Sequence, residues 1–123
     1  MSAPTVYDVV GGLEFFESLV DRFYEGVETD GALRPMYPED LAPGKHALAL
    51  FLAQYWGGPP TYSEQKGHPR LRMRHVGFAI GEQERDAWFK HMSAAVSSAD
   101  LEPEIEEAML DYFSMAATHM INR

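Results

Sequence analysis

The five histidines of this 123-residue chain are the side chains whose type and spacing first raise the question of metal or acid–base chemistry. They are His46, His68, His75, His91 and His119. None has the spacing to a second histidine and a carboxylate that a zinc hydrolase needs. The chain has no cysteine, which excludes thiolate metal sites and cysteine nucleophiles and fits a reducing compartment. Gly-rich phosphate loops and Gly-x-Ser-x-Gly turns are also missing. Any metal must therefore be held by histidine, carboxylate or methionine.

His75 differs from the other histidines in its apolar and basic surroundings. Pro69 suits the first position of a short helix that runs to His75, and Leu71, His75 and Phe78 fall on one face, so we expect the imidazole to point inward. An imidazole on an apolar face is more often a core residue than a ligand, and both interpretations stay open here. Haem would need only one imidazole, an apolar slot, and positive or hydroxyl groups for its propionates. The candidates for the propionate role are Lys66, Arg70, Arg72, Arg74 and Tyr62.

Tyr24, Tyr37 and Trp88 form a second candidate set, because each is a large ring with a hydrogen-bond donor. Taken singly, each is most simply a core aromatic whose polar end finds a backbone partner. The three belong to separate predicted elements, so they could converge on one apolar pocket. Their O–H and N–H groups would then be aimed at a bound ligand.

The spacing of apolar residues predicts an all-α chain. No segment shows a convincing two-residue alternation, and no repeat is present. The predicted helices cover residues 13–27, about 48–56, 69–75, a stretch from about 82, and one from about 103 to 120. Residues 31–44, with three prolines, and residues 57–68 are predicted loops, with one short turn around 32–36. Such long loops suggest that something other than helix packing organises this part of the chain.

Length and charge narrow the class of protein. We expect one domain over residues 1–123. The net charge of −9 argues against nucleic-acid binding. The N-terminus has neither the basic stretch nor the apolar run of a signal peptide, and no window approaches the about 18 apolar residues of a membrane span. A cytoplasmic protein without membrane contact is expected. The basic cluster at residues 66–74 fits a solvated face and a seat for an anionic ligand equally well.

Motifs along essentially the whole chain resemble those of the truncated, two-over-two haemoglobins, and specifically their second group. The most specific part runs from Thr61-Tyr62-Ser63-Glu64-Gln65 through Gly67-His68-Pro69-Arg70-Leu71-Arg72-Met73-Arg74-His75 to Glu84-Arg85-Asp86-Ala87-Trp88. Further matches are Gly11-Gly12, Arg22-Phe23-Tyr24, Tyr37-Pro38-Glu39-Asp40 and Gln54-Tyr55-Trp56-Gly57-Gly58-Pro59. A chance match of this length is implausible.

This resemblance implies an all-α truncated globin fold, a two-over-two helical sandwich around haem b (iron protoporphyrin IX). It implies that His75 is the proximal iron ligand and that Tyr24, Tyr37 and Trp88 form the distal hydrogen-bonding set. Gly44 and Leu48 are expected to face the ligand. The expected haem contacts are Phe23, Leu48, Phe51, Leu52, Tyr62, Leu71, Arg74, His75, Phe78 and Met92.

The chain departs from the group's pattern at the start of the second long helix. Members often carry a larger residue at the position of Gly44 and a basic residue at the position of Ala47, and the connection before Gly44 is about one residue short. Lys45 or His46 could replace the missing base in holding a propionate. These departures bear on how open the distal entry is.

The function expected from the residues and the resemblance is ligand binding at haem iron. Oxygen on ferrous haem gains superoxide character, so each donor aimed at it stabilises the bound state by roughly 1.5–3 kcal/mol, and every ~1.4 kcal/mol is tenfold in affinity. We expect binding of oxygen, nitric oxide, carbon monoxide or peroxide. Redox chemistry toward nitric oxide or peroxide, of the dioxygenase or peroxidase type, would need a reductase that the sequence does not identify.

Two other functions stay open at this stage. The first is a sensor or store that binds ligand without turnover. The second belongs to another class, a haem-free helical interaction module in which His75 and the aromatics are only core. Members of the resembling group are often homo-oligomers, and the exposed helix faces here fit a monomer and a dimer equally.

Overall fold

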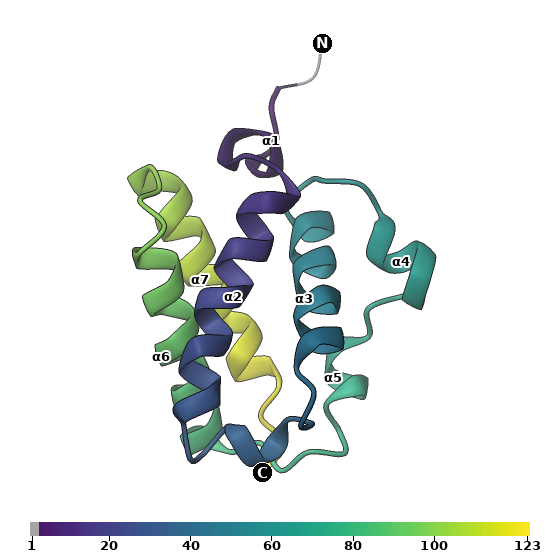
Figure 1. The fold of residues 1–123 in the computed structure, drawn as a ribbon, viewed down its shortest axis with the longest axis vertical. Helices are drawn as coiled ribbons and strands as arrows, with labels where there is room; N and C mark the ends of the chain where they lie inside the picture. The colour runs from purple at the N-terminus through teal and green to yellow at the C-terminus, as the bar shows by residue number, and fades with distance from the viewer. Residues whose placement is uncertain (1–2) are drawn as a thin grey trace. The chain divides into compact units, whose positions relative to one another are not determined.

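The computed structural model describes residues 3–123, and over that range the chain is helical without a strand (Figure 1). Met1 and Ser2 lie outside the described residues. They begin the N-terminal stretch in which the sequence shows no features of a signal peptide. The elements are α1 (Val6–Val10), α2 (Leu13–Thr29), the 3-10 helix η1 (Arg34–Met36), α3 (Ala42–Tyr55), α4 (Thr61–Lys66), α5 (Leu71–Arg74), α6 (Glu82–Ser97) and α7 (Pro103–His119). The predicted all-α class is confirmed.

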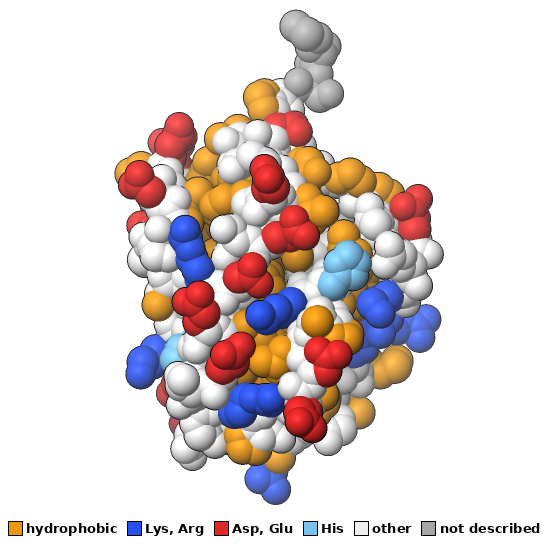
Figure 2. Space-filling model, viewed as in Figure 1, with side chains coloured by type: hydrophobic (Ala, Val, Ile, Leu, Met, Phe, Trp, Pro, Cys, Tyr) orange, Lys and Arg blue, Asp and Glu red, His pale blue; other side chains and the backbone are white. Residues whose placement is uncertain are grey.

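These elements belong to two compact units. The first combines Met1–Asp21, as far as it is described, with Asp40–Pro69, and the second combines Arg22–Glu39 with Arg70–Arg123. Helix α2 runs through both, as its apolar spacing predicts. The acidic residues of this helix are exposed, and red side chains descend along the face shown in Figure 2; they are Glu14, Glu17, Asp21, Glu25 and Glu28. No helix in the described chain combines the length and the apolar character needed to cross a membrane.

In the first unit, paired glycines allow α1 to meet both its neighbours. Gly11 and Gly12 have φ angles of 110° and 74°, a left-handed conformation that glycine adopts without a steric penalty, and they give a sharp entry into α2. Gly57 and Gly58 follow α3 and lie against α1. A Cβ at Gly57 would come within 2.5 Å of the Cβ of Thr5, so a side chain there would push α1 away.

Helices α3 and α4 show where sequence periodicity falls short. Helix α3 begins at Ala42 rather than near residue 48, and it includes Pro43 because the first turn of a helix needs no N–H from that residue. The predicted loop 57–68 contains α4. Gln54 on α3 fixes α4, since its amide donates to Ser63 Oγ at 2.8 Å and accepts from the Ser63 N–H at 3.0 Å.

The short helix before His75 also differs from its prediction. It begins at Leu71 rather than at Pro69, because Arg70 adopts a left-handed conformation with a φ of 43°. It ends at Arg74, so Phe78 lies beyond the helix and does not share a helical face with Leu71 and His75. The Phe78 side chain is 45% exposed.

In the second unit, α6 and α7 pack against each other (Figure 1). The apolar spacing of α6 predicts that Trp88, Met92 and Ala95 or Val96 point inward; Met92, Ala95 and Val96 are buried, and Trp88 is half-buried. On α7 the buried residues are Met109, Phe113 and Ala117. Of the apolar residues whose spacing predicts this helix, at positions 105, 109, 112, 116 and 120, Met109 is buried and the other four are half-buried; the buried residues instead follow a four-residue spacing.

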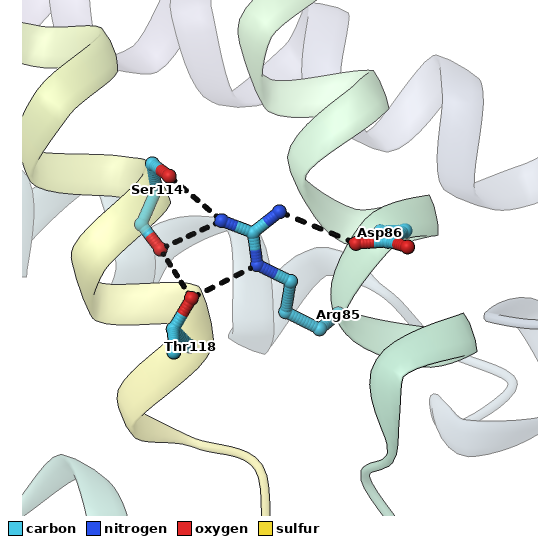
Figure 3. Close-up of polar contacts among 4 residues, drawn as sticks. All are labelled: Arg85, Asp86, Ser114 and Thr118. Atoms are coloured by element: carbon cyan, nitrogen blue, oxygen red, sulfur yellow. Dashed lines mark hydrogen bonds and ion pairs between the residues drawn. The ribbon is translucent and has the colours of Figure 1, made fainter.

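Arg85 joins the beginning of α6 to the end of α7 (Figure 3). Its Nε donates to Thr118 Oγ1 at 3.1 Å, and its Nη2 donates to the carbonyl and hydroxyl oxygens of Ser114 at 3.0 and 2.7 Å. Its Nη1 lies 3.3 Å from Asp86 Oδ1, and the guanidinium carbon lies 5.0 Å from the Phe89 ring centroid. The guanidinium of Arg85 therefore contacts four residues, and its hydrogen bonds to Ser114 and Thr118 hold the first turns of α6 against α7.

Candidate functional site

The three ring donors predicted from the sequence converge in the second unit. Tyr24 lies on α2, Tyr37 directly follows η1, and Trp88 lies on α6. The rings of Tyr24 and Tyr37 meet edge to face with centroids 5.7 Å apart, and the Trp88 indole N–H donates to the Tyr37 hydroxyl. Phe23 contacts both Tyr24 and Trp88, with centroid distances of 5.4 and 5.2 Å. We call Phe23, Tyr24, Tyr37 and Trp88 the aromatic cluster.

Burial keeps both phenols of the aromatic cluster protonated. Tyr24 is 4% exposed, and burial raises its pKa above the ordinary value. Burial also raises the pKa of Tyr37, and the neighbouring Tyr24 raises it further, while the hydrogen bond from Trp88 opposes the change. An anion is costly in this apolar setting. At neutral pH the cluster therefore presents O–H groups, which can donate hydrogen bonds.

The turn that leads to Tyr37 is organised by Asp30 at the end of α2. The Asp30 carboxylate accepts from the Ala32 N–H at 2.8 Å, and its carbonyl accepts from the N–H groups of Leu33 and Arg34. His91 on α6 contacts the same carboxylate, with 2.7 Å between Nε2 and Oδ2. The His91 ring lies against Gly26, where a Cβ would overlap it. The end of α2 is thus fastened to the helix that carries Trp88.

We expect Asp30→Asn to lower the midpoint of thermal unfolding at pH 7 by a few degrees, and to lose this effect in acid. In the folded protein the hydrogen bonds from His91 and then from the Ala32 N–H lower the pKa of Asp30. Because the folded pKa is lowered, its stabilisation is fully present above the ordinary value of 3.8 and is lost as the pH falls through the folded value.

Circular dichroism of the haem-loaded protein between pH 7 and pH 3 measures this difference. Asp111→Asn, on the exposed face of α7, is the matched control and should change little at any pH. A difference between Asp30→Asn and the parent chain that stays constant down to pH 3 would contradict the assigned role of the ionised carboxylate.

His75 is half-buried at the end of α5, and its ring is oriented by the backbone. Nδ1 lies 2.6 Å from the carbonyl oxygen of Leu71. A carbonyl can only accept, so Nδ1 carries the proton, and Nε2 keeps the lone pair that a metal ligand needs. Metal-bound imidazoles are typically oriented by such a hydrogen bond from the second nitrogen. The geometry of this residue suits an iron ligand.

Asn122, near the C-terminus, holds the segment that follows His75. Its Nδ2 donates to the carbonyl oxygens of His75 and Phe78 at 3.3 and 2.8 Å, and its Oδ1 accepts from the Ile80 N–H at 3.0 Å. Its own N–H donates to the Ile80 carbonyl at 2.8 Å. Sequence reasoning missed Asn122, since one amide 47 positions from His75 gives no local signal.

The surroundings of His75 in the chain fit a flat apolar group such as haem. Phe78 and His75 have ring centroids 6.4 Å apart, and Met73, Val76 and Phe78 are exposed, Val76 by 73%. A group of exposed apolar side chains within six residues of the chain suits a binding surface, because contiguous apolar patches commonly mark one. Among the residues predicted to contact haem, Leu71 is half-buried, Met92 is buried and Arg74 is exposed.

The remaining predicted haem contacts belong to the first unit. Phe51 and Leu52 on α3 and Tyr62 on α4 are buried, Leu48 is half-buried, and the rings of Phe51 and Tyr62 meet edge to face at 5.6 Å. Their contact with haem stays a prediction. At the departures from the family pattern, Gly44 and His46 are exposed, and Lys45 Nζ lies 3.8 Å from Asp21 Oδ1.

The helical fold and the His75 imidazole, oriented by the Leu71 carbonyl, fit a globin, and comparison with known proteins places the chain more closely. Residues 5–122 match the family of bacterial-like globins. A group 2 truncated haemoglobin of Bacillus subtilis is 41% identical over 117 residues, which cover 95% of this chain and 88% of the relative. The chain therefore belongs to the bacterial-like globins and, among them, to the group 2 truncated haemoglobins.

Solved structures agree with this assignment. The haemoglobin of the thermophilic phototrophic bacterium Chloroflexus aurantiacus is 52% identical with a TM-score of 0.96, over 98% of this chain and 100% of that one. A truncated oxygen-avid haemoglobin from Bacillus subtilis is 40% identical with a TM-score of 0.91, over 97% and 100% of the two chains. The predicted truncated globin fold is confirmed. As a globin, the chain binds haem and small gas ligands such as oxygen.

Proposed function

We propose that this chain is a haem b globin that retains oxygen tightly and uses it, or peroxide, in redox chemistry. The observation that carries the proposal is the aromatic cluster, in which Tyr24, Tyr37 and Trp88 meet as neutral donors in an apolar setting. In this proposal His75 holds the iron through Nε2. When bound, haem supplies an iron that takes a diatomic ligand or peroxide.

The proximal side of the proposal rests on His75 and its neighbours. The Leu71 carbonyl keeps the proton on Nδ1, which orients the ring and raises the basicity of Nε2. Asn122 limits the movement of the chain that carries Phe78. Leu71 and Phe78 would pack against the porphyrin, and the exposed guanidinium of Arg74 would pair with a propionate.

The distal side of the proposal favours retention over delivery. A hydrogen bond to a charged group contributes roughly 1.5–3 kcal/mol, so two donors that meet a ligand with anionic character would slow its release about a hundredfold or more. The Trp88–Tyr37 hydrogen bond orients the phenol before a ligand arrives, which reduces the cost of ordering it. The relative whose structure is described as oxygen-avid supports this direction.

The same donors would assist redox chemistry toward nitric oxide or peroxide. A donor aimed at peroxide stabilises the charge that develops as the O–O bond breaks. Tyr24, Tyr37 and Trp88 are themselves oxidisable, so they could pass an electron from an external reductant. Repeated turnover requires a reductase of still unknown identity.

The test uses the full chain loaded with haem and reduced to the ferrous state. The oxygen dissociation rate is measured by stopped flow. The protein in aerated buffer is then mixed with nitric oxide, which should give one nitrate per ferrous iron oxidised to ferric, and in a separate assay with peroxide and an excess of an organic reductant. Slow release with nitrate formation or peroxide turnover supports the proposal. Slow release with neither reaction would favour the sensor or store, and rapid release would refute retention.

A further inference from the structure

The side chain of Arg34 binds three consecutive carbonyl groups directly after η1. Nη1 donates to the carbonyl oxygens of Tyr37 and Pro38 at 3.3 and 3.1 Å, and Nη2 donates to that of Glu39 at 3.1 Å. The planar guanidinium carries five N–H donors in a fixed fork, which suits several acceptors held on one edge. One side chain thus holds the main chain of the segment from Tyr37 to Glu39.

Arg34 holds Tyr37 from both sides of the residue. The Tyr37 N–H donates to the Arg34 carbonyl at 3.2 Å, while the Tyr37 carbonyl accepts from the Arg34 side chain. Tyr37 itself is extended, with φ −108° and ψ 150°, and the next residue, Pro38, has no N–H. Helical hydrogen bonds therefore cannot continue past Tyr37, and the guanidinium supplies donors at this point instead.

The anchor of Arg34 is the end of α2. The Arg34 N–H donates to the Asp30 carbonyl at 2.8 Å, and Asp30 is paired with His91 on α6. The Tyr37 hydroxyl, at the other end of the same residue, accepts from Trp88, which also lies on α6. The main chain of Tyr37 is thus set by Arg34, and its side chain is set by Trp88.

We propose that Arg34 is a positioning residue for Tyr37, which sets the direction of the phenol and thereby slows the release of a ligand. The inference rests on the proposed function of Tyr37 as a ligand donor. Arg34 acts through the main chain of Tyr37 and not through its charge. A lysine at position 34 would keep the charge, but its compact ammonium cannot reproduce the fork across three carbonyls.

The test is the oxygen dissociation rate of the ferrous, haem-loaded protein in a double-mutant cycle. Arg34→Gln and Arg34→Lys should each raise the rate by about three- to tenfold, which is part of the effect of Tyr37→Phe. In the Tyr37→Phe background, Arg34→Gln should not raise the oxygen dissociation rate further, since the hydroxyl that Arg34 positions is already absent. Arg22→Gln is the matched control, because Arg22 is an exposed arginine of α2 whose Nη1 donates to Ser98 Oγ, and the rate should not change.

A spectroscopic measurement separates positioning from a general loss of structure. The C–O stretching frequency of the carbon monoxide complex reports donors near the ligand. Both Arg34 variants should move it toward the value of Tyr37→Phe, while haem content and the unfolding midpoint stay near those of Arg22→Gln.

Four results would overturn the inference. Parent-like kinetics in Arg34→Lys together with fast release in Arg34→Gln would show that charge is the cause. If Arg34→Gln raises the oxygen dissociation rate equally in the parent chain and in the Tyr37→Phe background, Arg34 acts on the ligand by some means other than Tyr37. If both Arg34 variants release oxygen at the rate of the parent chain while Tyr37→Phe releases it fast, the positioning role of Arg34 is rejected and the role of Tyr37 stands. If Tyr37→Phe itself leaves the rate unchanged, the proposed function fails at Tyr37 and the inference fails with it.

Discussion

Replacing His75 with alanine is expected to abolish stable haem binding, with haem loss faster by more than about a hundredfold. Removal of a mere partner of a metal ligand already costs roughly 10–100-fold in metal affinity, and the ligand itself should matter more. The Leu71 carbonyl that orients the imidazole would also lose its donor. Transfer of haem from the variant to an acceptor apoprotein, followed by absorbance, measures the rate.

His119→Ala is the matched control, since it removes an exposed imidazole at the end of α7 and should leave haem loss unchanged. Free imidazole added to His75→Gly should restore part of the ferrous spectrum. Full haem retention in His75→Ala with an unaltered ferrous spectrum would reject this residue as the iron ligand.

Tyr37→Phe and Trp88→Phe are each expected to raise the oxygen dissociation rate by roughly ten- to a hundredfold. Each substitution removes one donor and keeps an aromatic ring. The rings of Phe23 and Phe113, at 5.2 and 6.0 Å from that of Trp88, should therefore keep position 88 filled. Stopped-flow measurement on the ferrous protein gives the rates.

The two effects should not multiply in the double variant. Trp88 donates to the Tyr37 hydroxyl, so loss of either residue also disturbs the other. Tyr7→Phe, which removes a phenol from α1, is the control and should leave the rate unchanged. Unchanged rates in both single variants would refute the distal role of the aromatic cluster.

Sequence reasoning succeeded where a signal is local and periodic. The spacing of apolar residues predicts the long helices α2, α6 and α7 to within a few residues, and Gly11-Gly12 form the turn into α2. The resemblance to truncated haemoglobins, carried by continuous motifs, gave the family and the fold. It also named Tyr24, Tyr37 and Trp88, which the structure brings together.

Sequence reasoning failed where tertiary contacts decide the structure. Helix α4 is too short for periodicity and depends on Gln54. The buried residues of α7, a helix that packs against α6, follow a four-residue spacing that differs from the one predicted. The side chains of Asn122 and Arg34 bind main-chain carbonyl groups. Every residue has such a group, so the sequence does not indicate which one is the partner. Side chains that bind backbone carbonyls therefore escape motif analysis even when they serve a functional residue.

The polar contacts of α6 have a consequence for its freedom of rotation. Arg85, Trp88 and His91 follow one another at three-residue intervals, so each is turned by roughly 60° from the one before. They reach three different partners, which are α7, Tyr37 and the end of α2. Rolling α6 about its axis toward one partner strains its bonds to the others. The rotation of the helix is therefore fixed by more contacts than it needs, and the direction of the Trp88 N–H is set by contacts along about two turns of helix rather than by the ring's own packing.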